Sequence, residues 1–362
     1  MTDGVNPAFA DKRAITVAAL LALGVLTFPT VAARADELSL TETGSSLLYP
    51  LFNVWVSEYT KTHPGIHLTT GSTGSGAGIE QAISGAVQIG ASDAYMSDAQ
   101  ARQNPQIVNV PMAISALTVN YNLPELNIAQ HLKLDGPTLA GIYTGKIRAW
   151  DDKSIATLNP DIKLPHHDII PIHRADGSGD TFVFTQYLTF STPTWEDKQG
   201  YGTTITWPDV PGGLNADGNL GVLRASQQTP YSITYIGVSL HAEVAEANLG
   251  TALLKSYSGE FLLPTPETIA SAAAALTPRT PADERLTLVN APGANAYPLV
   301  NYEYAIVSTR QANPATAEAI RKFLLWATAP DETNEKYLAD AHFIALPAHI
   351  WVLSHDQIEM IR

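Results

Sequence analysis

The chain has 362 residues, no cysteine and a formal net charge of −14 at pH 7, with 45% hydrophobic and 15% charged residues. The lack of cysteine excludes disulfides, and the negative charge argues against binding to nucleic acid or to anionic membrane surfaces. The composition is typical of a globular protein, and the length predicts two domains because single cores stop growing near about 250–300 residues.

The first 35 residues have the pattern of a secretory signal peptide. Lys12 and Arg13 precede an uncharged stretch over residues 14–33, and Ala33-Arg34-Ala35 offers a small-x-small cleavage site. Cleavage after about Ala35 leaves 327 of the 362 residues, with a net charge of about −15 because residues 1–35 carry +1. A retained membrane anchor is the alternative, although the stretch is near the lower length limit for a span. A lipid anchor is not expected, since it needs a cysteine after the signal.

Short apolar stretches alternate with helical patterns along the rest of the chain. Strands are predicted at residues 66–70, 87–91, 117–120, 169–173, 233–236 and 304–308. Helices are predicted at residues 49–60, 79–84, 136–143, 181–188 and 315–328, and residues 242–288 give no clear pattern. This alternation predicts an α/β fold with parallel sheets and helices on both faces. In such sheets ligands bind beyond the carboxyl ends of the strands.

Three glycine- and hydroxyl-rich loops each run into a predicted helix. They lie at residues 43–46, 73–78 and 174–180, and Gly90-Ala91-Ser92-Asp93 is a further polar loop after a strand. A helix start offers backbone N–H groups and the positive end of the helix dipole, and glycine lets the backbone approach a ligand. Arg174 adds a fixed charge. Together the loops predict a site for a small oxyanion, although any one of them is also typical of an ordinary helix cap.

Familiar nucleotide-binding and catalytic motifs do not match the chain. No lysine follows Gly78 as a P-loop requires, and residues 74–78 have the wrong glycine spacing for a dinucleotide fingerprint. No G-x-S-x-G nucleophile elbow occurs. The ten histidines show no H-E-x-x-H pattern, so we expect neither a metal nor a cofactor.

In chain order, these loops resemble the ligand loops of the periplasmic phosphate-binding proteins, the PstS family. The matching segments are residues 42–50, 73–78, 90–94 and 174–184, with Gly145-Lys146-Ile147, Trp150-Asp151-Asp152 and Leu158-Asn159-Pro160. The resemblance covers nearly the whole chain from about Leu38 and is closest to mycobacterial-type members.

The resemblance implies the two-lobed type II periplasmic binding protein fold with two crossing hinge strands. The crossings are expected at residues 115–122 and 297–308. Lobe I would then hold about residues 36–120 and 302–362, and lobe II about residues 121–301. The ligand cleft would lie between the lobes.

The resemblance also implies a phosphate site built from all four loops. The expected donors are the hydroxyls of Ser45, Ser46, Ser75 and Ser178, the backbone N–H groups of Leu47 and Gly179, and the guanidinium of Arg174. An arginine fork suits a tetrahedral oxyanion. Asp176 is expected to orient Arg174 and partly neutralise it, and an Asx turn is the other role open to it.

Two aspartates are expected to respond to the protons of the ligand. An ionised carboxylate only accepts hydrogen bonds, so Asp93 would require a proton that phosphate carries at neutral pH and sulfate lacks. Asp180 stands where many family members have a threonine, and it would need a second ligand proton or its own protonation. Each residue is also typical of a helix cap, Asp93 for the segment from Tyr95 onward and Asp180 for the helix at residues 181–188.

The sequence therefore predicts a periplasmic receptor that binds inorganic phosphate without catalysis. It would deliver phosphate, as a monomer, to the membrane permease subunits of an ABC importer. The alternative is a secreted phosphatase or phosphate-transfer enzyme with Ser75 or Ser178 as nucleophile. Such a serine needs a base, and His173 is the histidine nearest to Ser178 in the sequence. A surface adhesin and a binder of sulfate or organic phosphate also remain open.

Overall fold

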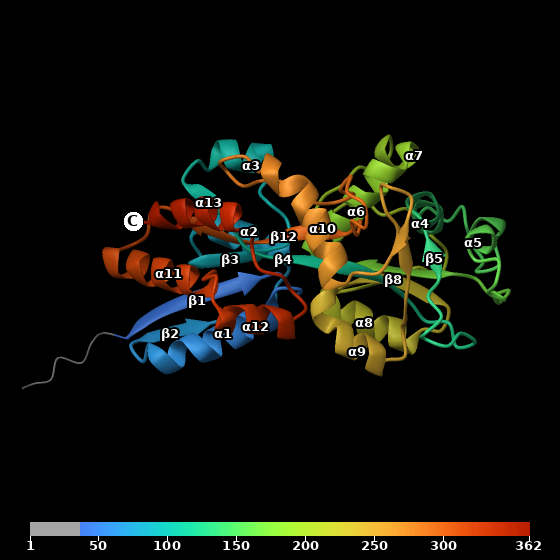
Figure 1. Cartoon of the computed structure of the whole chain (residues 1–362), viewed down its shortest axis with the longest axis horizontal. Helices are drawn as coiled ribbons and strands as arrows, with labels where there is room; N and C mark the ends of the chain where they lie inside the picture. The colour runs from blue at the N-terminus through green and yellow to red at the C-terminus, as the bar shows by residue number, and fades with distance from the viewer. Residues whose placement is uncertain (1–36) are drawn as a thin grey trace, which may run out of the picture. The chain divides into compact units, whose positions relative to one another are not determined.

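The computed structural model describes residues 37–362 (Figure 1). The predicted signal peptide, residues 1–35, lies outside the described residues. Within residues 37–362 no helix is both long and apolar enough to cross a membrane.

Strands and helices alternate through most of the described chain. The strands are β1 (Leu38–Gly44), β2 (Ile66–Thr69), β3 (Ile89–Ser92), β4 (Ile107–Tyr121), β5 (Lys133–Leu134), β6 (Ile170–Arg174), β7 (Leu214–Ala216), β8 (Ser232–Gly237), β9 (Gly250–Thr251), β10 (Leu253–Lys255), β11 (Phe261–Leu262) and β12 (Val300–Ser308). The helices are α1 (Tyr49–Thr62), α2 (Ser75–Ser84), α3 (Asp98–Gln103), α4 (Gly136–Tyr143), α5 (Lys153–Leu158), α6 (Gly179–Ser191), α7 (Pro193–Glu196), α8 (Gly218–Gln228), α9 (His241–Glu246), α10 (Pro266–Leu276), α11 (Pro314–Ala327), α12 (Glu332–Asp340) and α13 (Ala348–Glu359).

Each predicted strand overlaps an observed strand, and each predicted helix overlaps an observed helix. The sequence pattern missed β1, most of β4 and several further elements, among them α8, α12 and α13. The region at residues 242–288, which gave no clear pattern, folds into the elements from α9 to α10. Apart from α10, these elements have only two to six residues, which are too few positions for a period to stand out.

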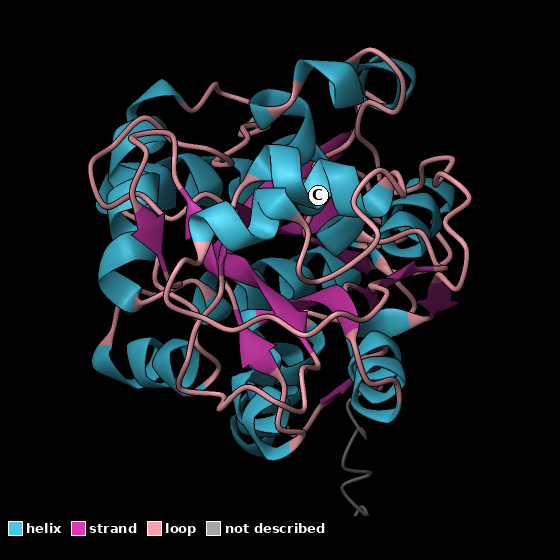
Figure 2. Ribbon diagram, turned by 90° about the vertical axis from the view of Figure 1, so that its right-hand side faces the viewer, coloured by secondary structure: helices cyan, strands magenta, loops and turns pink. Residues whose placement is uncertain are grey.

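The main sheet has nine strands, eight of them in the order β2-β1-β3-β12-β4-β8-β6-β7, with β9 paired to β4. Strand β1 pairs in parallel with β2 and β3, and β6 pairs in parallel with β7 and β8. The central strands differ, because β12 is antiparallel to β3 and β4, and β4 is antiparallel to β8. The prediction of parallel sheets is thus wrong for the centre, since an apolar run does not reveal strand direction. Figure 2 shows helices around the strands on several sides.

Strand β4 links the two parallel groups. All of its 15 residues are buried. Residues 107–116 pair with β12, whereas Leu117 to Tyr121 pair with β8, so the partner changes after Ala116. At this change Leu117 donates its N–H to the carbonyl of Leu299 at 2.9 Å, and the Tyr297 hydroxyl donates to the carbonyl of Leu117 at 2.8 Å. Figure 1 shows β4 running from β3 and β12 towards β8.

Candidate functional site

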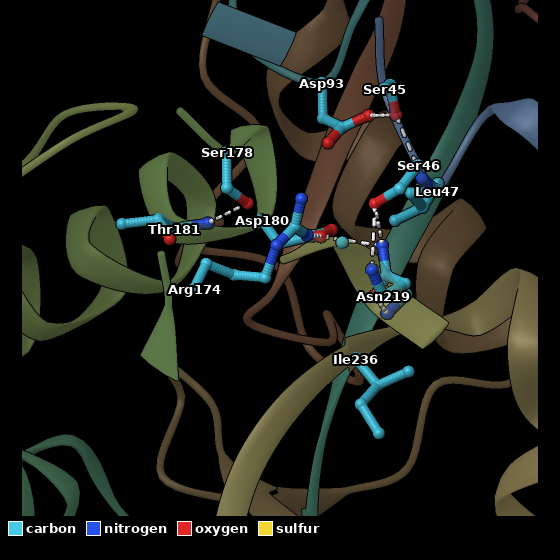
Figure 3. Close-up of polar contacts among 12 residues, drawn as sticks. Ser45, Ser46, Leu47, Asp93, Arg174, Ser178, Asp180, Thr181, Asn219 and Ile236 are labelled. Carbon is cyan, nitrogen blue, oxygen red and sulfur yellow. Dashed lines mark hydrogen bonds and ion pairs between the residues drawn. The ribbon is translucent and has the colours of Figure 1, made fainter. Parts of the chain in front are cut away.

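The carboxyl ends of β1, β3 and β6 each lead into one of the polar loops singled out in the sequence. Figure 3 shows Ser45, Ser46, Asp93, Arg174, Ser178 and Asp180 lying around one region. Each of these six residues is buried in the described structure. The loops are therefore brought together, as the alternation of strands and helices predicts.

The first loop joins β1 to α1, and its polar groups are partly engaged within the protein. Ser45 Oγ accepts hydrogen bonds from the N–H groups of Leu47 at 3.1 Å and Leu48 at 2.9 Å, and its hydroxyl donates to Asp93 Oδ1. A serine that bonds backbone groups two and three residues ahead is a common local motif. Ligand donation by Ser45 and Leu47 therefore stays a prediction that requires these bonds to be exchanged.

Ser46 keeps its proton available. Its Oγ accepts from the backbone N–H of Asn219 at 3.1 Å and from Asn219 Nδ2 at 2.9 Å. A hydroxyl has two acceptor sites and one proton, so two accepted bonds leave the proton free to donate to a third group. This arrangement fits the predicted role of Ser46 as a donor.

Asp93 follows β3 and is 2% exposed. Its Oδ1 accepts from Ser45, and its Oδ2 accepts from Ser75 Oγ at 3.2 Å. Burial raises the pKa of Asp93, and hydrogen bonds from its neighbours together with the charge of Arg174 oppose this. The helix-cap alternative is wrong, because α3 begins at Asp98 and Ser97 caps it.

Arg174 ends β6 and is 3% exposed. Its Nε donates to Asp176 Oδ1 at 2.6 Å, its Nη2 to Asp176 Oδ2, and its Nη1 to Asp180 Oδ2. Burial disfavours the charged form of Arg174, but the carboxylates of Asp180 and Asp176 outweigh this effect and raise the pKa of Arg174. Burial likewise opposes ionisation of Asp176, yet Arg174 outweighs it and lowers the pKa of Asp176. A guanidinium has five N–H donors, so one on each terminal nitrogen remains for a ligand.

Asp180 lies in the first turn of α6 and is fully buried. Its Oδ2 accepts from Arg174 Nη1 and from Asn219 Nδ2 at 2.7 Å, whereas its Oδ1 has no hydrogen-bond partner among the described residues. Burial raises the pKa of Asp180 to about 7, with the charge of Arg174 opposing and that of Asp93 adding to the rise. The free Oδ1 is therefore the oxygen that takes a proton or accepts one from a ligand.

Ser178, rather than Asp180, caps α6. Ser178 Oγ accepts from the N–H of Thr181 at 3.1 Å, which removes the helix-cap alternative for Asp180. The Ser178 hydroxyl proton stays free to donate. Gly179 is the first residue of α6, so its N–H has no acceptor within the helix.

Gly179 also lets two loops meet. A Cβ at Gly179 would lie 2.4 Å from Asp93 Oδ2 and 2.6 Å from Ser75 Oγ. The N–H of Gly76 donates to the carbonyl of Gly177 at 2.8 Å beside it. The second and third loops are thus in direct backbone contact.

Gly179→Ala is expected to weaken anion binding by about 5- to 150-fold. Overpacking costs about 1–3 kcal/mol, and here the cost falls on the groups around Asp93. Calorimetric titration with phosphate measures the effect. Gly65→Ala is the matched control, because a Cβ there meets nothing within 4 Å. Equal binding by both variants would show that the two loops need not meet when the anion binds.

Comparisons with known proteins identify the family of the chain. Residues 30–331 match the model of the PBP superfamily domain. The phosphate-binding protein PstS of Methanocaldococcus jannaschii is 33% identical over 334 residues, covering 87% of this chain and 84% of that protein. The chain belongs to the PstS family of phosphate-binding proteins. PstS3 of Mycobacterium bovis BCG is 29% identical over 323 residues, covering 85% of this chain and 83% of that protein.

The solved structures support the fold. The phosphate-binding protein from Stenotrophomonas maltophilia superposes with a TM-score of 0.67 at 17% identity, covering 88% of this chain and 93% of that one. The chain has the two-lobed type II fold of the periplasmic binding proteins.

PstS proteins are transport receptors and not enzymes, and the phosphatase alternative has no support. Among residues 37–362 no histidine hydrogen-bonds to Ser75 or Ser178. His173 Nδ1 instead contacts the carbonyl of Arg174 at 2.9 Å, and its ring stacks on Trp207 with 4.7 Å between centroids. The described residues also contain no group of three or more His, Cys, Asp or Glu side chains placed to hold a metal ion.

Sequence reasoning missed two residues that contact the predicted binding residues. Asn219, in the first turn of α8, bonds both Ser46 and Asp180, and it accepts from the N–H of Gly237 at 2.8 Å. The sequence feature that could have identified Asn219 is a further glycine-containing polar stretch at the start of a helix, Asp217-Gly218-Asn219. Glu303 lies in β12 beside Asp93, and the sequence signal for it was that it is the only charged residue of that strand.

Proposed function

We propose that this chain is a periplasmic receptor that binds inorganic phosphate and passes it to the permease subunits of an ABC importer. The observation that carries the proposal is the pairing of buried donors with buried carboxylates in one site. Arg174, Ser46 and Ser178 offer N–H and O–H donors, whereas Asp93 and Asp180 accept protons. Such a set matches an anion that is both an acceptor and a proton donor. The PstS name of its relatives points to the same ligand.

The proposed binding residues are those predicted from the sequence, and Asn219 holds Ser46 and Asp180 in place beside them. They are Ser45, Ser46, Leu47, Ser75, Asp93, Arg174, Ser178, Gly179 and Asp180, with Asp176 holding Arg174. We further propose lobe I at residues 36–120 and 302–362, lobe II at residues 121–301, and phosphate held between them. The mature protein would begin after about Ala35, carry no lipid anchor and act as a monomer without a cofactor.

Thermal unfolding of the mature chain tests this function. A ligand that binds only the folded state adds about 2.7 kcal/mol of stability at 100 times its dissociation constant. Phosphate is therefore expected to raise the melting temperature, and a phosphate ester is expected to stay unhydrolysed. Release of product from the ester would favour the enzyme alternative. A melting temperature that does not change when phosphate is added would favour the adhesin alternative.

Asp180→Thr is expected to flatten the pH dependence of phosphate binding. As pH rises through about 7, Asp180 loses its proton, and phosphate also shifts from its monoanion to its dianion. With Asp93 and Asp180 both ionised, two ligand protons are needed and the dianion has one, so affinity falls on the alkaline side. Threonine restores a donor and binds the dianion better. Titration of both proteins at mildly acid and mildly alkaline pH checks this, and identical pH profiles would contradict it.

A further inference from the structure

Glu303 is a fully buried carboxyl group next to Asp93, because the adjacent residue Tyr304 pairs with Ser92 of β3. It lies in β12, opposite Ala113 of β4. Asn301, two residues earlier on the same strand, donates from Nδ2 to Glu303 Oε1 at 2.8 Å and to the carbonyl of Asp93 at 3.3 Å. Each of the two carboxyls shifts the pKa of the other, so the Glu303 and Asp93 side chains are close neighbours. Strand β12 therefore presents two side chains to Asp93.

The two oxygens of Glu303 have different surroundings. Oε1 accepts from Asn301 Nδ2 and from the hydroxyl of Ser115 in β4. Oε2 is buried and meets no donor among residues 37–362. Two ionised carboxylates cannot form a hydrogen bond with each other, and two buried ones in contact are not both charged. A proton on Oε2 resolves both problems.

The neighbours decide which of the two carboxyls keeps the proton. Asp93 accepts hydroxyl bonds from Ser45 and Ser75 and feels the charge of Arg174, all of which favour its ionised form. Among residues 37–362 no lysine, arginine or histidine forms an ion pair with Glu303, whereas Arg174 acts on Asp93. Burial and the charge of Asp93 raise the pKa of Glu303 well above its ordinary value. The other charged group facing Asp93 is Asp180 in α6.

We propose that Glu303 is a positioning residue for ligand selectivity, which stays uncharged and donates its carboxylic proton to Asp93. This inference rests on the proposed phosphate function. The donated bond stabilises ionised Asp93, so that Asp93 accepts a proton from the ligand and does not supply one. Without Glu303, buried Asp93 would take up a proton at mildly acid pH. Protonated Asp93 would then donate a hydrogen bond to the ligand, so the site would also accept sulfate.

Two substitutions separate this role from a merely structural one. Glu303→Gln keeps a donor towards Asp93 and an acceptor towards Ser115, so it is expected to preserve phosphate affinity within about threefold. Glu303→Met removes the donor, and is expected to weaken phosphate binding by roughly 10- to 100-fold, the loss of one hydrogen bond to a charged group. It is also expected to raise sulfate affinity at mildly acid pH. Glu284→Gln is the matched control, because Glu284 is a second buried glutamate that contacts Ser354 and Gln357 away from the site.

Calorimetric titration of the mature chain with phosphate and with sulfate measures these effects, and thermal melting checks that each variant folds. A tenfold gain of phosphate affinity in Glu303→Gln would show that Glu303 is ionised in the wild type and repels the ligand. An unchanged ratio of phosphate to sulfate affinity in folded Glu303→Met would show that Glu303 does not act on Asp93. Either result overturns the proposal.

Infrared difference spectra give a readout that does not depend on ligand binding or on Glu303→Met folding. The difference between the anion-free wild type and Glu303→Gln at neutral pH is expected to contain a protonated-carboxyl stretch. The stretches of Glu42 and Glu284, whose pKa values burial raises to about 8, are common to both proteins and cancel. Absence of this band overturns the proposal. A wild type that shows the band but binds no phosphate would instead refute the proposed function, so the two failures are distinguishable.

Discussion

Replacing Arg174 with alanine is expected to weaken phosphate binding by roughly 10²–10⁴. Hydrogen bonds to charged groups contribute about 1.5–3 kcal/mol each, and the guanidinium has one N–H left on each terminal nitrogen for the ligand. The substitution also removes the cation that faces Asp176 and Asp180. Those carboxylates would then repel the anion, which adds to the loss.

Calorimetric titration of the anion-free variant measures this effect. Arg148→Ala is the control, because the Arg148 side chain is 39% exposed and its contact with Asp168 is 3.8 Å long. Loss of a buried cation can also destabilise the fold, so Arg174→Lys serves as a second variant that keeps the charge but loses the planar fork. We expect Arg174→Lys to bind with intermediate affinity. An unchanged dissociation constant in folded Arg174→Ala would show that Arg174 does not touch the ligand.

Asp93→Asn is expected to erase most of the discrimination between phosphate and sulfate. In the wild type an ionised Asp93 needs a ligand proton, and sulfate would leave a buried acceptor facing an anion. Sites built around a matching hydrogen-bond partner reject analogues that lack it by roughly 10⁴–10⁵. We expect a preference for phosphate of at least about 10³, allowing for relaxation of the site. Asparagine presents an N–H donor to either anion, so sulfate gains and phosphate loses.

The wild type and Asp93→Asn are each titrated with phosphate and with sulfate at neutral pH. Asn301 is a useful comparison, because Asn301→Ala removes the donor to the Asp93 carbonyl and to Glu303 Oε1 but leaves both carboxyl groups in place. That variant is expected to keep preferring phosphate. A wild-type preference for phosphate that survives intact in Asp93→Asn would assign the selectivity to another residue.

The site loops could be predicted because their signals are local. Glycine and hydroxyl residues before a helix mark the loops at residues 73–78 and 174–180 within a few positions, and both lie in the site. The pairing of Arg174 with Asp176 was predicted from their separation of two residues in the sequence, and the structure contains it. The roles of these residues towards the ligand remain predictions.

The other features of the site and the sheet could not be predicted, because they depend on contacts between residues that are far apart in the sequence. Asn219 meets Ser46 across 173 positions, and Ser115 meets Glu303 across 188. Such partners are set by the register of β4 with β12 and by the placement of α8. Strand direction could not be predicted either, because buried parallel and buried antiparallel strands have the same apolar runs. Ser45 was expected to donate to the ligand, yet its hydroxyl donates to Asp93 and its oxygen accepts from the amides two and three residues ahead.

Titration of the wild-type mature chain, stripped of bound anion, with phosphate and then with sulfate tests the central claim most directly. We predict one phosphate per chain, bound at least about 10³ times more tightly than sulfate. Comparable affinities for the two anions would contradict the account, because they would show that Asp93 does not require a proton from the ligand.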